Sequence, residues 1–245
     1  MRYLIVSDIH SNIEAFKSVL SFFKRKKYNK ILFLGDLVGY GGAPNQVVDL
    51  FRSLNNKVYV RGNHDKVCSG LESGNHFNDK AKIAAIWTYR KLTRGNLNFL
   101  KKMPVGPLKV NDDILIAHGS PINEDFYVFS DFDAYQIFVQ TRNFITFIGH
   151  THIPLLYEFD GTDIRTLWLS DRMKLSLNPN RRYIVNPGSV GQPRDRDSRA
   201  SAIIYDDENK KLYTYRIGYN IIKACKKIEK EGLPYHLCTR LHYGV

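Results

Sequence analysis

The chain has 245 residues, of which 43% are hydrophobic, and it carries a formal net charge of +12. This length and composition suit a single domain with a substantial core and exclude intrinsic disorder. No apolar run approaches the roughly 20 residues that cross a bilayer, and a strand begins directly after Met1, so we expect no membrane anchor and no signal peptide. The positive charge favours anionic partners, small phosphoesters or nucleotides above all. Nucleic acid is not an expected partner, because the chain has no zinc-finger, helix-turn-helix or RNA-recognition signature.

The cysteines give an expectation about the compartment. Cys68, Cys225 and Cys238 are an odd number and have no CxxC spacing. Such a set fits a reducing compartment better than a disulfide framework. We therefore predict a cytoplasmic protein with three buried or unreactive thiols.

The first sixty residues alternate between short apolar strands and amphipathic helices. Strands are predicted over residues 3–6, 30–34 and 57–60. The helix after the first strand has Ser11 or Asn12 as its cap and an apolar stripe from Ile13 to Phe23. Pro44 suits the first turn of the second helix. This alternation predicts an α/β protein whose sites lie beyond the carboxyl ends of its strands.

The rest of the chain is predicted to complete a single domain over residues 1–245. Residues 66–104 have a helical pattern, and we expect them to form a small cap inserted into the domain. Further strands are predicted over residues 114–117, 144–148, 155–159, 164–169, 183–185, 202–205 and 212–216, the last two as a hairpin. Helices are predicted over 133–140 and, at the C-terminus, over about 219–231, while the polar segment 171–182 is predicted to be a mobile loop.

Polar side chains directly follow five of the predicted strands. They are Asp8 and His10, Asp36, Asn63 and His64, His118, and His150 and His152. Asp8 and His10 are two residues apart, so on extended backbone their side chains would point to one face. A single Asp or His at such a place is more often a turn or cap residue than a ligand. Five such strand ends together indicate a site for divalent transition metals, which accept mixed nitrogen and oxygen ligands.

These residues form an ordered set of motifs. It consists of Asp-x-His at 8–10, Gly-Asp-x-x-Gly at 35–39, Gly-Asn-His-Asp at 62–65, a lone His at 118 and Gly-His-x-His at 149–152. In this set and order the chain resembles the calcineurin-like metallophosphoesterase superfamily, and its Gly-Asp-Leu-Val-Gly-Tyr-Gly turn is similar to the small prokaryotic phosphodiesterase branch. The resemblance implies the fold of that family, a sandwich of two β-sheets flanked by helices.

The resemblance also implies two divalent metal ions. One would be held by Asp8, His10, Asp36 and His152, and the other by Asp36, Asn63, His118 and His150, with Asp36 bridging. Manganese is the expected metal, but iron, zinc or nickel would satisfy the same ligands.

The expected catalytic residues are Asp36 and His64. In the family, a hydroxide that bridges the metals attacks phosphorus, and two metals roughly 3.5–4 Å apart clamp the attacking and leaving oxygens. His64 resembles the proton donor of the family, and Asn63 and His64 are also expected to contact the substrate. The alternative for His64 is a structural hydrogen bond to its turn.

Two positions depart from the pattern of the serine/threonine protein phosphatases. Where those enzymes continue the Gly-Asp motif with an Asp and an Arg, this chain has Gly39 and Tyr40. The sequence therefore does not identify the residue that orients His64. Asp65 is adjacent to it in sequence. The loop 186–194 is also similar to that of the small prokaryotic branch, and this resemblance implies that the loop lies near the metals, where Arg194 would contact substrate phosphate. A solvent-exposed arginine in a Gly/Pro turn explains the same sequence equally well.

The expected function is hydrolysis of a phosphodiester or a nucleotide-type phosphoester. The alternative enzymatic activities are dinucleoside polyphosphate hydrolysis and protein dephosphorylation. The alternative that is not an enzyme is a scaffold or binding protein on the same fold. The seven ligand positions are all occupied by the residue types that the family uses, which favours the enzyme. No feature of the sequence indicates an oligomeric state.

Overall fold

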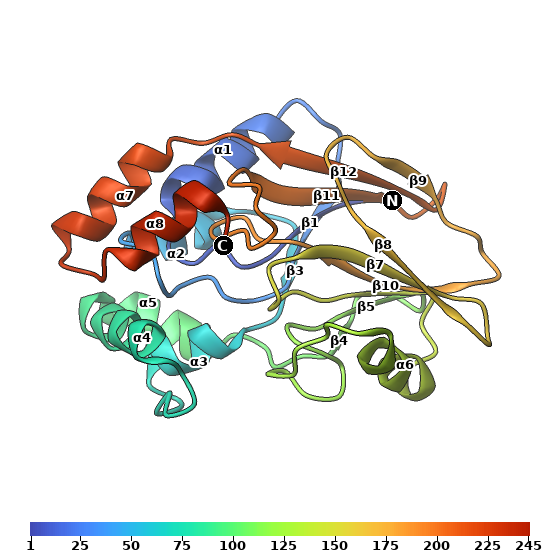
Figure 1. The fold of residues 1–245 in the computed structure, drawn as a ribbon, viewed down its shortest axis with the longest axis horizontal. Coiled ribbons are helices and arrows are strands. Elements are labelled where there is room, and N and C mark those ends of the chain that lie inside the picture. Colours follow the sequence, from blue (N-terminus) through green and yellow to red (C-terminus); the bar gives the residue numbers. More distant parts are fainter.

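Two six-stranded mixed sheets face each other, and helices cover their outer faces (Figure 1). This computed structural model describes residues 1–245 and confirms the predicted two-sheet α/β architecture. Sheet A consists, in spatial order, of β3 (Lys57–Tyr59), β2 (Lys30–Phe33), β1 (Arg2–Val6), β11 (Ala200–Asp206), β12 (Lys211–Ile217) and β9 (Lys174–Ser176). Sheet B consists of β4 (Leu108–Lys109), β5 (Ile114–Ile116), β6 (Ile145–Phe147), β10 (Arg182–Pro187), β7 (Pro154–Phe159) and β8 (Ile164–Trp168).

Eight helices surround the sheets. They are α1 (Ile13–Phe23), α2 (Pro44–Ser53), α3 (Asn63–Ser69), α4 (Asp79–Lys91), α5 (Arg94–Lys101), α6 (Asp131–Gln140), α7 (Ile221–Lys230) and α8 (His236–Tyr243). In Figure 1, α7 and α8 lie at one end of the molecule beside α1, whereas α6 lies at the other end against sheet B. The helices α4 and α5 fall within the stretch 66–104 that was predicted to be helical, whereas α3 begins three residues before it, at Asn63. None of the eight is both long and apolar enough to span a membrane.

Alternation along β1 separates two hydrophobic cores. Tyr3 and Ile5 point into the core between the two sheets, whereas Leu4 and Val6 point to the helices on the outer face of sheet A. Successive side chains of a strand face opposite sides, so one short strand contributes to both cores. The helix α1 begins where predicted, because the side chain of Asn12 accepts a hydrogen bond from the Ala15 amide.

Parallel pairing brings the carboxyl ends of five strands to one region. In sheet A, β1 pairs in parallel with β2, and β2 with β3. In sheet B, β5 pairs in parallel with β6. The loops that follow these five strands carry the motif residues, as the sequence predicted.

The segment 171–182 is not a simple loop. Lys174–Ser176 form β9, which pairs antiparallel with β12 at the edge of sheet A. The prediction was wrong because an edge strand with one exposed face is polar, and its pairing partner lies about 40 residues further along the chain.

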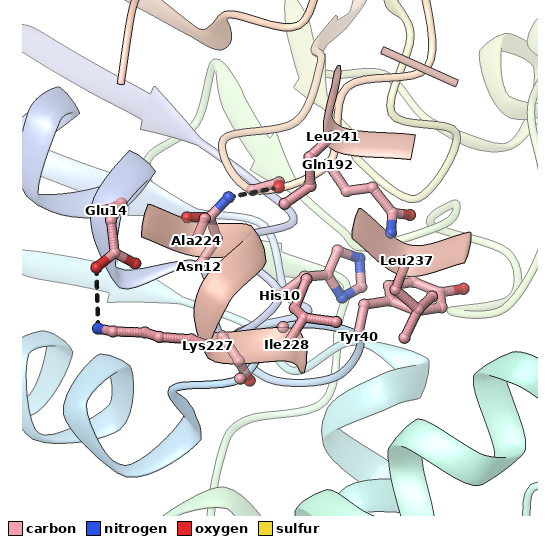
Figure 2. A pocket seen from close by; sticks show the side chains of 14 residues that line it. His10, Asn12, Glu14, Tyr40, Gln192, Ala224, Lys227, Ile228, Leu237 and Leu241 are labelled. Atoms are coloured by element: carbon pink, nitrogen blue, oxygen red, sulfur yellow. Dashed lines mark hydrogen bonds and ion pairs between the residues drawn. The ribbon is translucent and has the colours of Figure 1, made fainter. Parts of the chain in front are cut away.

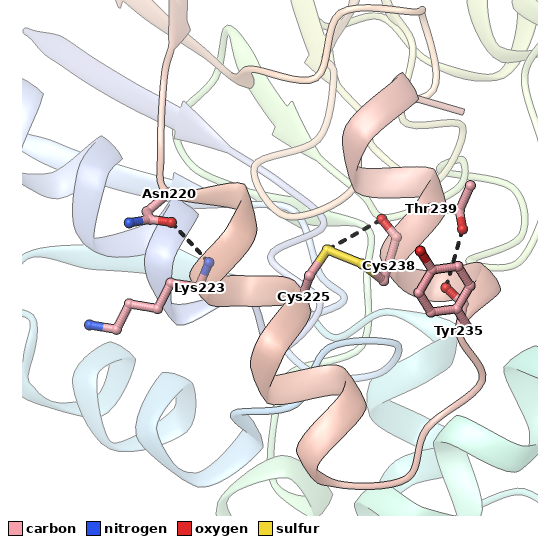
Figure 3. Close-up of a disulfide and its surroundings, with 6 residues drawn as sticks. All are labelled: Asn220, Lys223, Cys225, Tyr235, Cys238 and Thr239. Atoms are coloured by element: carbon pink, nitrogen blue, oxygen red, sulfur yellow. Dashed lines mark hydrogen bonds between the residues drawn. A yellow bond between two sulfur atoms is a disulfide. The ribbon is translucent and has the colours of Figure 1, made fainter.

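The prediction of three free thiols is also wrong. Cys225 on α7 and Cys238 on α8 form a disulfide, with their Cα atoms 4.9 Å apart, and only Cys68 is free (Figure 3). The C-terminal helix was predicted to end near residue 231, but a further helix, α8, folds back on α7 and brings the two cysteines together. The cysteines therefore give no support to the expected reducing compartment.

Loss of this disulfide should lower the stability of the protein. Closing a loop of about 15 residues restricts the unfolded chain by about 3 kcal/mol. We expect a reductant to lower the Tm of the wild-type protein, and the variant Cys225→Ser/Cys238→Ser to have a lower Tm that no longer responds to reductant. Thermal unfolding followed by circular dichroism measures both. An equal response of the double variant to reductant would contradict the assignment.

Candidate metal centre

The seven side chains that were predicted as metal ligands converge between the two sheets. Their ligand atoms form groups in which every atom lies within 4.8 Å of the others: Asp8 with His10 and His152, and Asp36 with His118 and His150. The side-chain oxygen of Asn63 lies 3.1 Å from Nε2 of His118. All seven residues are buried.

Asp36 lies between the two groups. Its Oδ2 is 3.6 Å from Nε2 of His10 and 3.4 Å from Nε2 of His118. In the group of Asp8, His10 and His152, Oδ1 of Asp8 lies 3.2 Å from Nε2 of His152. Of the two carboxylates, Asp36 alone is therefore within reach of both halves of the centre.

Backbone carbonyls fix the tautomer of three of the histidines. Nδ1 of His10 lies 3.1 Å from the carbonyl of Val38, Nδ1 of His118 lies 2.8 Å from that of Leu34, and Nδ1 of His152 lies 2.6 Å from that of Gln192. Since a carbonyl only accepts, each Nδ1 donates. When it is neutral, each of these rings presents the lone pair of Nε2 to the centre, as metal-binding histidines do.

The donor set fits divalent cations. Oδ1 of Asp8 and Oδ2 of Asp36 are buried and have no hydrogen-bond partner. Nε2 of His10 and Nε2 of His152 face each other at 3.1 Å. Unpaired buried carboxylate oxygens and opposed lone pairs are costly in a folded protein, and a cation among them removes the cost.

The electrostatics of the centre favour the charged forms of its carboxylates. Burial by itself raises the pKa of Asp36, but His118, His64 and His10 together outweigh it and hold the pKa well below its usual range. Burial likewise lowers the pKa of His118, yet Asp36, Asp8 and the carbonyl of Leu34 together outweigh it and raise that pKa to about 10. Without metal, His118 therefore holds a proton that compensates Asp36.

The ligand-bearing turns have a strained backbone. Asp8, His10, Asp36, His150 and His152 all have positive φ, between 47° and 69°. The strand β1 ends at Val6, so Asp8 and His10 do not converge through extended backbone, as the sequence analysis assumed. Residues in this region cost about 1–3 kcal/mol each and persist only where their surroundings hold them.

Asp65 holds two of these turns together. Its Oδ2 accepts hydrogen bonds from the amides of Asp36 and Gly62, each at 2.9 Å, and its Oδ1 accepts from the amides of Leu37 and Val38. The carboxylate is completely buried. Asp65 therefore positions the backbone of Asp36 and does not contact the ring of His64, which answers the question that the sequence left open.

Packing orients His64 instead. Its ring centre lies 4.4 Å from those of Tyr40 and Phe77, and its amide donates to Oδ1 of Asp36 at 2.8 Å. Nδ1 of His64 is buried and has no partner. Gly39, with φ of +107°, leaves the space for this ring, because a Cβ atom there would lie 2.6 Å from Nδ1.

The loop 186–194 lies against the Asp8 turn. The amide of Gly191 and the hydroxyl of Ser189 both donate to the carbonyl of Asp8. Arg194 is half-buried at the end of this loop, and its Nη2 lies 3.4 Å from the hydroxyl of Tyr40. Arg194 is therefore beside the candidate metal centre and not on a remote turn.

Two further neighbours of the centre were not predicted from the sequence. Tyr127 stacks on His150, with ring centres 3.7 Å apart. On the other side, α7 and α8 cover His10, where Leu237 and Leu241 line a small cavity with Tyr40 and Gln192 (Figure 2). An aromatic residue in a loop and a second C-terminal helix carry no local signal that would associate them with metal ligands.

Comparisons with known proteins agree with this geometry. A family model described as calcineurin-like phosphoesterase matches residues 1–188. An uncharacterized protein of Methanocaldococcus jannaschii, MJ0912, is 38% identical over 247 residues, which is 98% of this chain and 97% of that protein. A metallophosphoesterase from Sphaerobacter thermophilus has a crystal structure with a TM-score of 0.89 at 36% identity, with both chains fully covered. The hypothetical protein PH1004 from Pyrococcus horikoshii, at 20% identity, has the same fold, with a TM-score of 0.80 over 100% of this chain and 98% of that one.

Asp65→Asn should weaken metal binding although Asp65 contacts no candidate metal position. An amide in place of the carboxylate presents an NH₂ group to backbone donors, which displaces the Asp36 turn, and residues that orient ligands typically change metal affinity by about 10–100-fold. Titration of the metal-free protein with Mn²⁺ measures the affinity. Asp133→Asn is the matched control, because Asp133 also accepts backbone amides, those of Phe129 and Ser130, but at the start of α6. Equal affinities of the two variants would contradict the prediction.

Metal binding should release a proton from His118. Its pKa of about 10 in the metal-free protein means that the ring is charged at pH 7 and must lose its proton to become a ligand. Affinity should therefore rise as the pH approaches 10, by up to about tenfold per pH unit. Calorimetry with Mn²⁺ in buffers of different ionisation enthalpy counts the protons released. Heats that do not depend on the buffer at pH 7 would contradict the prediction.

Proposed function

Because this chain belongs to the calcineurin-like phosphoesterase family and is thus a phosphoesterase hydrolase, we propose that it hydrolyses small phosphodiesters or nucleotide-type phosphoesters at a two-metal centre. The observation that carries the proposal is the position of Asp36. Its unpaired Oδ2 lies between Nε2 of His10 and Nε2 of His118. A carboxylate so placed suits a ligand shared by two cations.

The proposed ligands divide into two sets that share Asp36. One ion would be held by Asp8, His10, Asp36 and His152, and the other by Asp36, Asn63, His118 and His150. When bound, the two ions would supply positive charge against the phosphate and activate a water molecule for attack. Manganese, iron, zinc and nickel all accept these ligands.

We assign proton transfer to His64. As the water oxygen forms its bond to phosphorus, the bond from phosphorus to the leaving oxygen breaks, and the proton of His64 passes to that oxygen. Burial lowers the pKa of His64 to about 4, so the ring is neutral in the free protein at pH 7. The negative charge of a bound phosphate beside the ring opposes this shift and favours the protonated form.

Arg194 is the proposed phosphate contact from the protein itself. It is half-buried next to the centre, and its Nε has no hydrogen-bond partner. An arginine can donate two parallel hydrogen bonds to phosphate oxygens. Asn63 and His64 are proposed to contact the substrate from the opposite turn, and the helical segment from α3 to α5 is proposed as a cap over it.

Hydrolysis and metal content test the proposal together. Protein purified with Mn²⁺ should hydrolyse bis(p-nitrophenyl) phosphate and should bind about two metal ions per chain by elemental analysis. If the protein shows no metal-dependent turnover of any phosphoester in a panel, the proposed enzymatic activity is wrong. Fewer than one metal ion per chain under replete conditions would favour a scaffold on the same fold.

His64→Asn should separate proton transfer from metal binding. A positioned general acid typically contributes about 10²–10⁴-fold, so kcat for a diester with an alkoxide leaving group should fall by about that factor. The fall should be smaller for a p-nitrophenolate leaving group, which needs little protonation. His76→Asn, at an exposed histidine between α3 and α4, is the control. Equal losses for both leaving groups would contradict the assignment.

A further inference from the structure

Two arginines from distant segments lie at Tyr40. Arg194, in the loop after β10, donates to the hydroxyl of Tyr40, and its guanidinium lies 5.9 Å from the centre of that ring. Arg240, on α8, lines a pocket together with Tyr40. Neither arginine forms an ion pair with an Asp or Glu side chain; Nε of Arg240 donates to the main-chain oxygen of Val245, and Nη2 of Arg194 also donates to the side-chain oxygen of Gln192. The arginines that form ion pairs with Asp or Glu are Arg2, Arg61, Arg181, Arg199 and Arg216.

The two cations act on each other. Burial and the positive charge of Arg194 both lower the pKa of Arg240. Two like charges that are partly withdrawn from water destabilise the folded protein where no acidic side chain pairs with them. An anion that accepts hydrogen bonds from both guanidinium groups supplies that compensation.

The pocket next to them is large enough for an anionic group. It has a volume of about 290 Å³, close to the lower end of the roughly 300–1,000 Å³ of ligand pockets. Lys80 at the start of α4 and His236 at the start of α8 line it together with Arg240, and Asp79 is its one acidic residue. The pocket therefore collects cationic side chains from two separate helices.

Tyr40 separates this pocket from the candidate metal centre. Its ring centre lies 4.4 Å from that of His64 and 4.7 Å from that of His10, and the same residue forms a wall of the pocket. His64, in its proposed role, faces the leaving oxygen. A leaving group that extends past His64 and around the Tyr40 ring would reach this pocket.

We propose that the pocket beside Tyr40, with Arg240 and Lys80 in its lining, binds a second phosphate carried by the leaving group. This inference rests on the proposed function and narrows it. The substrates are phosphoesters or phosphoanhydrides in which the leaving group has a phosphate of its own, as in nucleoside polyphosphates. The net charge of +12 gives such polyanions a favourable field as they approach.

Binding of two nucleotides that differ by one phosphate tests the proposal. The probes are AMP and α,β-methylene-ADP, which resists hydrolysis, titrated calorimetrically into manganese-loaded protein at one fixed concentration of free Mn²⁺. The wild-type protein should prefer the diphosphonate by about tenfold or more, because one charge-assisted hydrogen bond is worth at least that factor. Equal affinity for the two probes would overturn the proposal.

Three variants locate the preference. Arg240→Ala and Lys80→Ala should each reduce the preference to within about threefold, whereas Lys223→Ala should retain it, because Lys223 is an exposed cation of α7 outside the pocket. If Arg240→Ala prevents folding, as judged by its Tm, Lys80→Ala carries the test from a different helix. A preference that survives both pocket variants, or that Lys223→Ala reduces equally, would overturn the proposal.

These experiments distinguish failure of the proposed phosphate subsite from failure of the proposed hydrolysis. The titrations need no hydrolysis, so a phosphoesterase without the second subsite hydrolyses the diester panel but binds both probes equally. A protein with the subsite but without the proposed reaction shows the preference and no turnover.

Discussion

The four backbone amides that donate to Asp65 are the constraint on which the candidate centre depends. They come from residues 36–38 and from Gly62, and thus from the turns after β2 and β3. Asp36 has φ of 58°, a conformation that a free loop would leave. The buried carboxylate keeps it there, and Asp36 is the residue that the two halves of the centre share. A residue that is not a ligand therefore determines where the shared ligand lies.

The centre joins the two sheets. Sheet A contributes Asp8, His10, Asp36 and Asn63 from the ends of its parallel strands, and sheet B contributes His118, His150 and His152. Nδ1 of His118, from sheet B, donates to the carbonyl of Leu34 at the end of β2, so the orientation of a sheet B ligand is fixed by sheet A. Such a centre forms only when the sandwich is complete, which couples metal affinity to the folding of the whole domain.

The C-terminal helices α7 and α8 form part of the surroundings of the candidate metal centre. Nearly all the motif residues precede residue 153, yet α7 and α8 cover His10 (Figure 2). The helix α8 also brings Arg240 to the pocket beside Tyr40. The disulfide between them fixes α8 against α7 (Figure 3). The reaction type is thus a property of the strand ends, whereas the proposed second phosphate subsite takes Arg240 from a C-terminal helix.

The sequence by itself determined the reaction family and all seven candidate ligands, because strand ends followed by Asp, Asn and His in a fixed order are a local signal. It also gave most strands and helices, whose apolar periodicity is local too. Only the tertiary structure decided that Asp65 holds the Asp36 turn, that Cys225 meets Cys238, that β9 is a strand and that Arg240 lies at Tyr40. Each of these features depends on a contact with a residue that is distant in sequence, and the residues next to it in sequence do not indicate that contact. The left-handed backbone at Asp8 and His10 belongs with them, because hydrogen bonds to the turn after β2 impose it.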